Sequence, residues 1–162
     1  MKQILVREAL CSGCRACEVA CVARHEGQCG TASARIRVFK DESLGVDRPR
    51  VCRMCLDAFC VSACPTAALA RHVVAGTILL DSEQCLCCTA CADACSFGVL
   101  SVHPLTGLPL FCDLCDGDPA CVERCVTGAL VYGDPGAAAC AGQTPPLDGP
   151  GRQTGHPAGH RA

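Results

Sequence analysis

Cysteine spacing constrains this chain more than any other feature of its sequence. Nineteen of the 162 residues are cysteines. Two stretches follow the pattern C-x2-C-x2-C-x3-C, and two more follow it with four or five residues between the second and third cysteines. In chain order the motifs consist of Cys11, Cys14, Cys17 and Cys21; Cys52, Cys55, Cys60 and Cys64; Cys85, Cys88, Cys91 and Cys95; and Cys112, Cys115, Cys121 and Cys125.

This spacing is the one by which bacterial ferredoxins bind [4Fe–4S] clusters. Three thiols within seven residues lie on one tight loop, so their sulfur atoms can point at three corners of one cube. Structural zinc is the main alternative, and a zinc-stapled interaction module would use four thiolates, usually as two separated C-x2-C knuckles. A third thiol only three residues further on crowds a single zinc ion. We therefore expect four [4Fe–4S] clusters.

Three cysteines lie outside the motifs, namely Cys29, Cys87 and Cys140. Only Cys85 and Cys88 give the x2 spacing, so Cys87 is interpreted as a small packed residue and not as a ligand. Arg15, Arg53 and Arg124 lie within motifs. A positive charge near a cluster raises its reduction potential; alternatively, these arginines only offset the negative charge of the clusters or bind acidic residues of a partner.

The N-terminal segment argues for a reducing compartment. Residues 1–7 have no sustained apolar run and no twin arginine, so we expect no export signal. The longest apolar region, residues 67–80, is too short and too interrupted to cross a bilayer. We therefore expect a cytoplasmic protein without a membrane span. A reducing cytoplasm and an odd number of cysteines argue against a disulfide framework.

Charge argues against nucleic acid as a partner. The formal net charge is −2 with neutral thiols, and four clusters with their thiolates would bring it to roughly −10. The sequence has no run of Lys and Arg, no dinucleotide-binding glycine loop, no P-loop and no Ser/His/Asp set outside the motifs. We therefore expect no catalytic residue in this chain.

Short apolar or alternating segments separate the motifs. They predict strands over residues 4–6, 36–38, 69–74, 77–80, 99–102, 108–111 and 129–132, a helix over 21–25 and a polar link over 40–50. Motif, strand, turn, strand and motif recur, which indicates two ferredoxin-like units and an α+β fold. Residues 134–162 are rich in Gly, Pro and Ala and are expected to be disordered or bound to a partner.

Four motifs in this order resemble the iron–sulfur subunits of molybdenum and tungsten oxidoreductases, such as dimethyl sulfoxide reductase and formate dehydrogenase. The resemblance covers about residues 1–133. The stretch from Phe111 to Glu123 is most similar to the small subunits that accompany tungsten aldehyde oxidoreductases. Proline commonly follows the last thiol of such motifs, whereas Val22, Ser96 and Val126 stand here after the last thiols of three motifs.

The resemblance also implies that the fourth thiol of each motif binds the cluster of another motif. The implied ligand sets are Cys11, Cys14, Cys17 and Cys125; Cys21, Cys112, Cys115 and Cys121; Cys52, Cys55, Cys60 and Cys95; and Cys64, Cys85, Cys88 and Cys91. One bacterial-ferredoxin-like unit, about residues 45–104, would then be nested within another, about residues 1–40 plus 105–133. The first and fourth motifs must therefore be neighbours in the fold.

By this resemblance the chain is an electron-transfer subunit without catalytic activity of its own. It would carry single electrons through four clusters between a large tungsten or molybdenum enzyme and an acceptor. Subunits that serve carbon monoxide dehydrogenase, hydrogenase or formate dehydrogenase are alternatives within the same group. A free polyferredoxin that docks transiently through an acidic surface is another.

Overall fold

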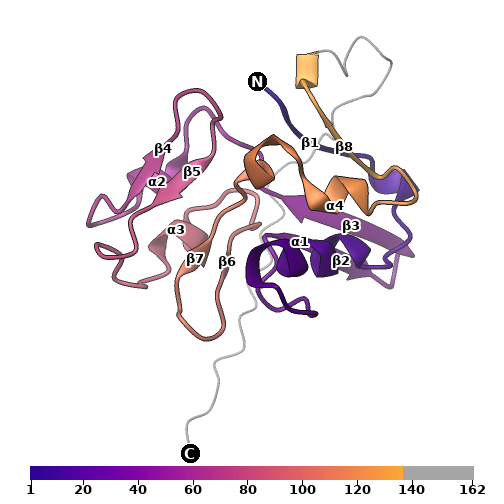
Figure 1. The fold of residues 1–162 in the computed structure, drawn as a ribbon, viewed down its shortest axis with the longest axis horizontal. Coiled ribbons are helices and arrows are strands. Elements are labelled where there is room, and N and C mark those ends of the chain that lie inside the picture. The colour runs from indigo at the N-terminus through magenta and orange to yellow at the C-terminus, as the bar shows by residue number, and fades with distance from the viewer. Residues whose placement is uncertain (137–162) are drawn as a thin grey trace, which may run out of the picture.

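The computed structural model describes residues 1–136 and shows short helices and hairpins around the cysteine motifs (Figure 1). The strands are β1 (Gln3–Val6), β2 (Ile36–Asp41), β3 (Val46–Val51), β4 (Leu69–Arg71), β5 (Ile78–Leu80), β6 (Ser101–Val102), β7 (Pro109–Leu110) and β8 (Leu130–Gly133). The helices are α1 (Ala16–Glu26), α2 (Phe59–Ser62), α3 (Ala90–Asp93) and α4 (Ala120–Glu123), with 3-10 turns η1 (Glu8–Leu10) and η2 (Leu114–Gly117). Few helices and small antiparallel sheets agree with the predicted α+β class. The tail predicted over 134–162 lies outside the described residues, apart from residues 134–136.

β1 and β8 join the two ends of the described fold. They form an antiparallel ladder in which Ile4 lies opposite Tyr132 and Val6 opposite Leu130. Next to this ladder, α1 is in contact with α4 (Figure 1). Since α1 carries the end of the first motif and α4 that of the fourth, these two motifs lie side by side.

β2 and β3 form a hairpin where a polar link was predicted over residues 40–50, so that prediction is wrong. The sequence of β3, VDRPRV, is charged and contains Pro49, which lowers its strand signal. A proline is tolerated there because both strands of a two-stranded sheet are edges. Asp41 closes the turn, where its carboxylate accepts the Ser43 hydroxyl at 2.6 Å and the Leu44 N–H at 3.2 Å.

The β4–β5 and β6–β7 hairpins share one turn design. A histidine begins each turn, and its Nδ1 accepts backbone N–H groups within the turn: Ala75 bonds to His72 at 3.0 Å, and Thr106 bonds to His103 at 3.2 Å. A glycine in the left-handed region ends each turn. The strands predicted over 69–74, 77–80, 99–102 and 108–111 are therefore present, but shorter than predicted.

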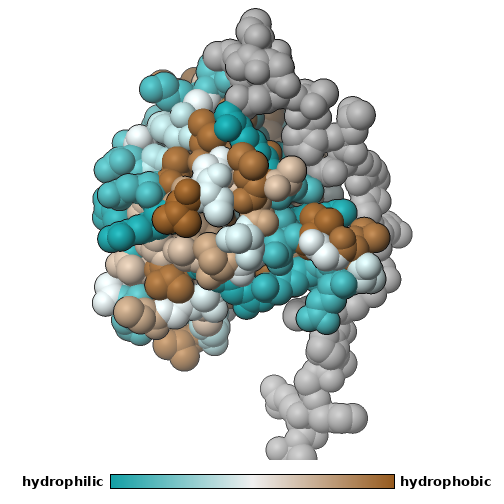
Figure 2. All heavy atoms as spheres, turned by 90° about the vertical axis from the view of Figure 1, so that its right-hand side faces the viewer, coloured by the Kyte–Doolittle hydropathy of each residue, from teal (hydrophilic) through white to brown (hydrophobic). Residues whose placement is uncertain are grey.

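Cysteines belong to both small cores of the fold. The larger core combines aliphatic residues of β1, β2, β3 and β8 with the buried thiols Cys17, Cys21, Cys112 and Cys121. The smaller one contains Leu69, Ile78, Cys91 and Phe111. On the face shown in Figure 2, hydrophilic side chains separate the apolar groups. Within residues 1–136, no helix has the length and hydropathy needed to cross a membrane.

Candidate iron–sulfur sites

Each cysteine motif bends through the left-handed region immediately before its second cysteine. The residues at this position are Gly13, Met54, Cys87 and Leu114, with φ of 64°, 48°, 51° and 61°. For a residue that carries a Cβ, this conformation costs about 1–2 kcal/mol. The bend turns backbone N–H groups toward sulfur, and the Gly13 N–H lies 3.4 Å from Cys11 Sγ. Such strain persists where the surrounding structure imposes it, typically at ligand sites.

Several thiols in these loops are buried, and burial raises their pKa values. Burial raises the pKa of Cys52 to about 11, although a hydrogen bond from the Met54 N–H opposes the rise. Burial raises the pKa of Cys112 still further, against a hydrogen bond from the Leu114 N–H. Four thiolates at one such site therefore require a bound cationic group that displaces the protons, as a metal cluster does.

A shared turn follows the last cysteine of three motifs. The residue three positions after the cysteine adopts a positive φ and donates its N–H to the cysteine carbonyl. These bonds join Ala67 to Cys64, Gly98 to Cys95 and Gly128 to Cys125, at 3.3, 2.9 and 3.1 Å. The turn therefore forms with Pro65, Ser96 or Val126 alike. Cys21 differs, because it lies inside α1 and the helix continues through Val22.

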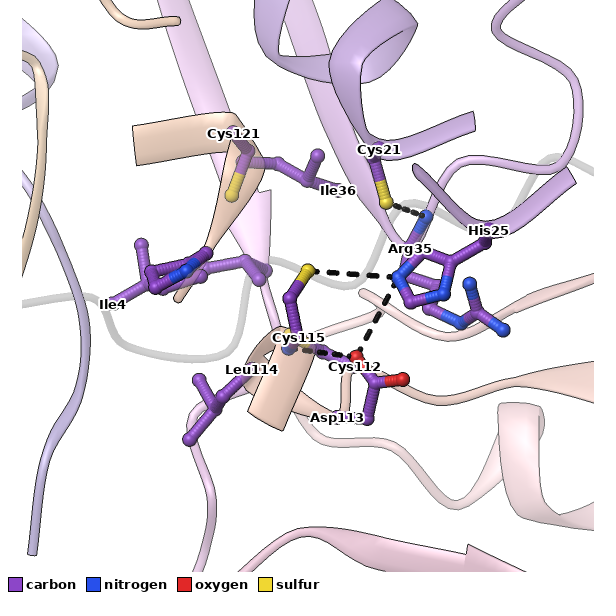
Figure 3. Close-up of a pocket in the computed structure, with 12 residues that line it drawn as sticks. Ile4, Cys21, His25, Arg35, Ile36, Cys112, Asp113, Leu114, Cys115 and Cys121 are labelled. Atoms are coloured by element: carbon purple, nitrogen blue, oxygen red, sulfur yellow. Dashed lines mark hydrogen bonds and ion pairs between the residues drawn. The ribbon is translucent and has the colours of Figure 1, made fainter. Parts of the chain in front are cut away.

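One cavity is lined by Cys21 of the first motif together with Cys112, Cys115 and Cys121 of the fourth (Figure 3). The Arg35 N–H donates to Cys21 Sγ at 3.3 Å. Across the cavity, His25 Nε2 lies 3.7 Å from Cys115 Sγ and 3.5 Å from the Asp113 carboxylate. The ligand atoms of His25, Asp113 and Cys115 lie within 4.8 Å of one another. Burial lowers the pKa of His25, so the imidazole is neutral there and the Asp113 carboxylate is the charged group of the three.

Two further cavities each gather the four motif thiols of one set, and Cys112 also lines the first of them. One is lined by Cys52, Cys55, Cys60 and Cys95. The other is lined by Cys64, Cys85, Cys88 and Cys91, with the additional thiol of Cys87. In both cases three thiols come from one motif and the fourth from the other, and α2 is in contact with α3 between them.

The remaining four thiols belong to the first and fourth motifs. The pKa of Cys11 is raised, first by burial and then by the nearby charges of Asp47, Cys14 and Cys125. Burial raises the pKa of Cys17 to about 12, and Glu18, Cys11 and Cys14 add to that rise. Cys125 therefore lies close enough to Cys11 to interact electrostatically with it, as the neighbouring helices α1 and α4 require.

The four thiol sets follow one another in a single order. Thiols of neighbouring sets pack in the same core: Cys17 with Cys121 and Cys112 with Cys52 in the larger core, and Cys91 with Cys60 in the smaller one. The set that contains Cys11 is therefore followed by the set that contains Cys21. The set that contains Cys52 comes next, and the set that contains Cys85 is last.

Residues outside the sets have varied surroundings. Cys29 is exposed, and Cys140 lies outside the described residues. Cys87 is exposed on the rim of the last cavity, with its Sγ 3.8 Å from the Thr106 carbonyl, so the interpretation of Cys87 as a packed residue is wrong. Arg53 stacks on the Phe97 ring at 5.0 Å and lines the cavity of Cys52. Arg35 lines two cavities and was not predicted, because it precedes a strand and lies outside every motif.

Comparison with known families places these motifs in context. Residues 44–135, more than half of the 162, match the 4Fe-4S dicluster domain. The chain belongs to the 4Fe-4S dicluster domain family. The match covers the second, third and fourth motifs of this chain. The 4Fe-4S cofactor of the family agrees with the interpretation of these motifs as iron–sulfur sites.

Several relatives of this chain carry names of redox proteins. It is 43% identical over 122 residues to the polyferredoxin-like subunit of aliphatic sulfonate oxidoreductase from Pyrococcus furiosus, with 75% of this chain and 70% of the relative covered. It is 34% identical over 160 residues to the electron transport protein HydN of Escherichia coli K12, with 83% and 89% covered. A chain in the active site complex BamBC of benzoyl coenzyme A reductase, bound to benzoyl-CoA, is 30% identical, with a TM-score of 0.52 and with 82% and 79% covered.

Proposed function

We propose that this chain binds four [4Fe–4S] clusters and conducts single electrons between a catalytic oxidoreductase subunit and a redox acceptor. The observation that carries the proposal is the lining of three cavities by three thiols of one motif and one thiol of another. The proposed ligand sets are Cys11, Cys14, Cys17 and Cys125; Cys21, Cys112, Cys115 and Cys121; Cys52, Cys55, Cys60 and Cys95; and Cys64, Cys85, Cys88 and Cys91.

The order of the sets supports a path for electrons through the whole molecule. Each set has a thiol that packs in the same core as a thiol of the next set, and Cys112 lines the cavities of both middle sets. When bound, the clusters supply the one-electron chemistry. The chain fixes their separation, excludes water through its two cores, and directs N–H groups at sulfur, which tunes the potentials.

The proposed organisation is nested. Residues of about 1–40 plus 105–133 form an outer ferredoxin-like unit around an inner unit of about 45–104, and a tail follows from residue 134. Pairing of β1 with β8 and contact of α1 with α4 support the outer unit. Contact of α2 with α3 supports the inner one.

We favour a tungsten or molybdenum enzyme of the aldehyde oxidoreductase type as the catalytic partner, on the resemblance of residues 111–123. The Pyrococcus furiosus relative and the chain in the BamBC complex carry names of multi-subunit enzymes, which supports a subunit role. The cysteine motifs account for the proposed electron transfer, so the chain is proposed to have no catalytic activity of its own. It is also proposed to work in a reducing cytoplasm.

A free electron carrier is the second candidate. The observation that favours it is the similarity to HydN, which is named an electron transport protein and is covered over 89% of its length. Stoichiometry separates the two candidates, because a subunit copurifies with an enzyme at a fixed ratio and a carrier does not.

The test is the iron and acid-labile sulfide content per chain after anaerobic purification from the native host, with the copurifying proteins identified. We expect about sixteen of each, together with a tungsten or molybdenum enzyme. Full iron without a companion would favour the free carrier. Iron near eight per chain would reduce the proposal to two clusters, and zinc in place of iron would refute it.

A further inference from the structure

Arg35 lies at the boundary between two of the four thiol sets. It lines the cavity of Cys21, Cys112, Cys115 and Cys121, and it also lines the cavity of Cys52, Cys55, Cys60 and Cys95. Its backbone N–H donates to Cys21 Sγ at 3.3 Å. In Figure 3 its side chain lies beside the His25 ring.

One buried nitrogen atom of the Arg35 guanidinium, Nη1, has no hydrogen-bond partner in the described part of the chain. Within residues 1–136, two buried side-chain nitrogen atoms make no hydrogen bond: Arg35 Nη1 and Arg48 Nε. Arg48 Nε faces the Glu8 carboxylate at 3.6 Å, so a negative group accounts for it. A buried, unpaired donor on a permanently charged group is costly unless an acceptor or a negative charge compensates it.

Arg37, two residues further along the chain, has hydrogen-bond partners for its guanidinium. Arg37 donates to the carbonyls of Thr31 and Ala32 at 2.7 and 2.5 Å. It lines neither of the two cavities. Arg35 is therefore distinguished by its place between the two thiol sets.

The charge of Arg35 acts on the thiols around it. Burial raises the pKa of Cys21, and both the N–H and the positive charge of Arg35 oppose the rise. The pKa of Cys115 is also raised mainly by burial, and the charges of Arg24 and Arg35 are among the effects that oppose it. Arg35 thus favours negative sulfur on its side of the cavity.

We infer that Arg35 is the counter-charge shared by the second and third clusters of the path, and that it raises the reduction potentials of both relative to the outer two. This inference rests on the proposed assignment of four clusters. A cluster with four thiolates is negative and becomes more negative on reduction, so a nearby guanidinium stabilises the reduced form. The cluster sulfurs also supply the acceptors that Arg35 Nη1 lacks. Arg35 is a positioning residue and carries no electron itself.

The test is an anaerobic redox titration of the purified full-length protein, followed by electron paramagnetic resonance. The variants are Arg35→Gln, which removes the charge, Arg35→Lys, which keeps it, and Arg37→Gln as the matched control. We expect Arg35→Gln to shift two of the four potentials to more negative values and to leave two in place. Arg35→Lys should shift them less, and Arg37→Gln should leave all four unchanged.

Other results of the titration would overturn the inference or separate it from the proposed function. Unchanged potentials in Arg35→Gln, or an equal shift of all four, would overturn the inference. If Arg35→Gln loses iron, restoration of the iron by Arg35→Lys supports a charge role, and failure to restore it would overturn that role in favour of packing. Parent protein without four clusters would instead refute the proposed function, so the two failures are distinguishable.

Discussion

Cys52 and Cys112 line the same cavity, although they belong to the second and fourth motifs. Cys112 also lines the cavity of Cys21, so one residue borders two candidate cluster sites. The proposed outer and inner units meet at Cys112, which lines both cavities. Any electron that crosses the molecule along the proposed path passes this point, and Arg35 lines both cavities here.

Exchange of the fourth cysteine between motifs predicts which cluster a single substitution removes. Cys95→Ser is expected to lower the iron content by about four per chain. The thiols of Cys52, Cys55 and Cys60 should then react with an alkylating agent under native conditions, because they share a cavity with Cys95. Peptide mass spectrometry identifies the alkylated sites. Cys87→Ser is the control and should keep all iron; alkylation of Cys85 and Cys88 instead would contradict the assignment.

Thr89 has an exposed side chain and a φ of 62°, a conformation that disfavours a β-branched residue. Thr89→Gly should relieve about 1 kcal/mol of strain and slow the loss of cluster absorbance in guanidinium. Ala92→Gly, in the same helix α3, is the matched control and should accelerate that loss, since glycine costs about 0.5–1 kcal/mol inside a helix. Equal acceleration by both substitutions would show that the bend is not strained.

Glu18 is buried, with 2% of its surface exposed, and its carboxylate accepts the Val38 N–H at 2.6 Å. This bond fastens α1 to β2. Glu18→Ala leaves the Val38 N–H unpaired and should cost about 1–3 kcal/mol of stability, measured as a lower temperature of cluster loss. Glu18→Gln keeps an acceptor and should cost less. Glu42→Ala, at an exposed position, should have no effect, and a similar effect of Glu42→Ala and Glu18→Ala would contradict this account.

Removal of iron is expected to unfold much of the chain. Buried cysteines are part of both cores, and each of the four motifs holds a residue with a Cβ in the left-handed region. Without a bound group that binds all four sulfurs, neither feature is compensated. Chelation should therefore abolish amide protection in α1, and anaerobic reconstitution with iron and sulfide should restore it. Persistent protection in the iron-free chain would contradict the expectation.

The sequence predicted those elements that depend on neighbouring residues alone. The hairpin strands around residues 69–80 and 99–111 follow from apolar segments interrupted by glycine turns, and their positions were predicted. β3 was missed because its sequence is charged and contains Pro49, and only pairing with β2 makes it a strand. α1 begins earlier than predicted, at Ala16, because a left-handed Arg15 directs the chain into the helix ahead of Cys17.

Long-range features left weaker signals in the sequence. Nothing local in Ile4–Val6 specifies pairing with β8, so proximity of the first and fourth motifs was predicted only through the family resemblance. The place of Arg35 between two cavities depends on four separate motifs meeting around it. No spacing rule within a single motif contains that information.

Pairing of β1 with β8 has a consequence for biogenesis. A ribosome releases Gln3–Val6 well before the strand that must lie beside it, Leu130–Gly133. Chains fold as their parts emerge, so the segments between these strands can pair before the ends meet. The thiols of Cys11 and Cys14 therefore stay on a nascent chain without their neighbour Cys125 until the fourth motif has been synthesised. The first motif can therefore be completed only after the fourth motif has been made.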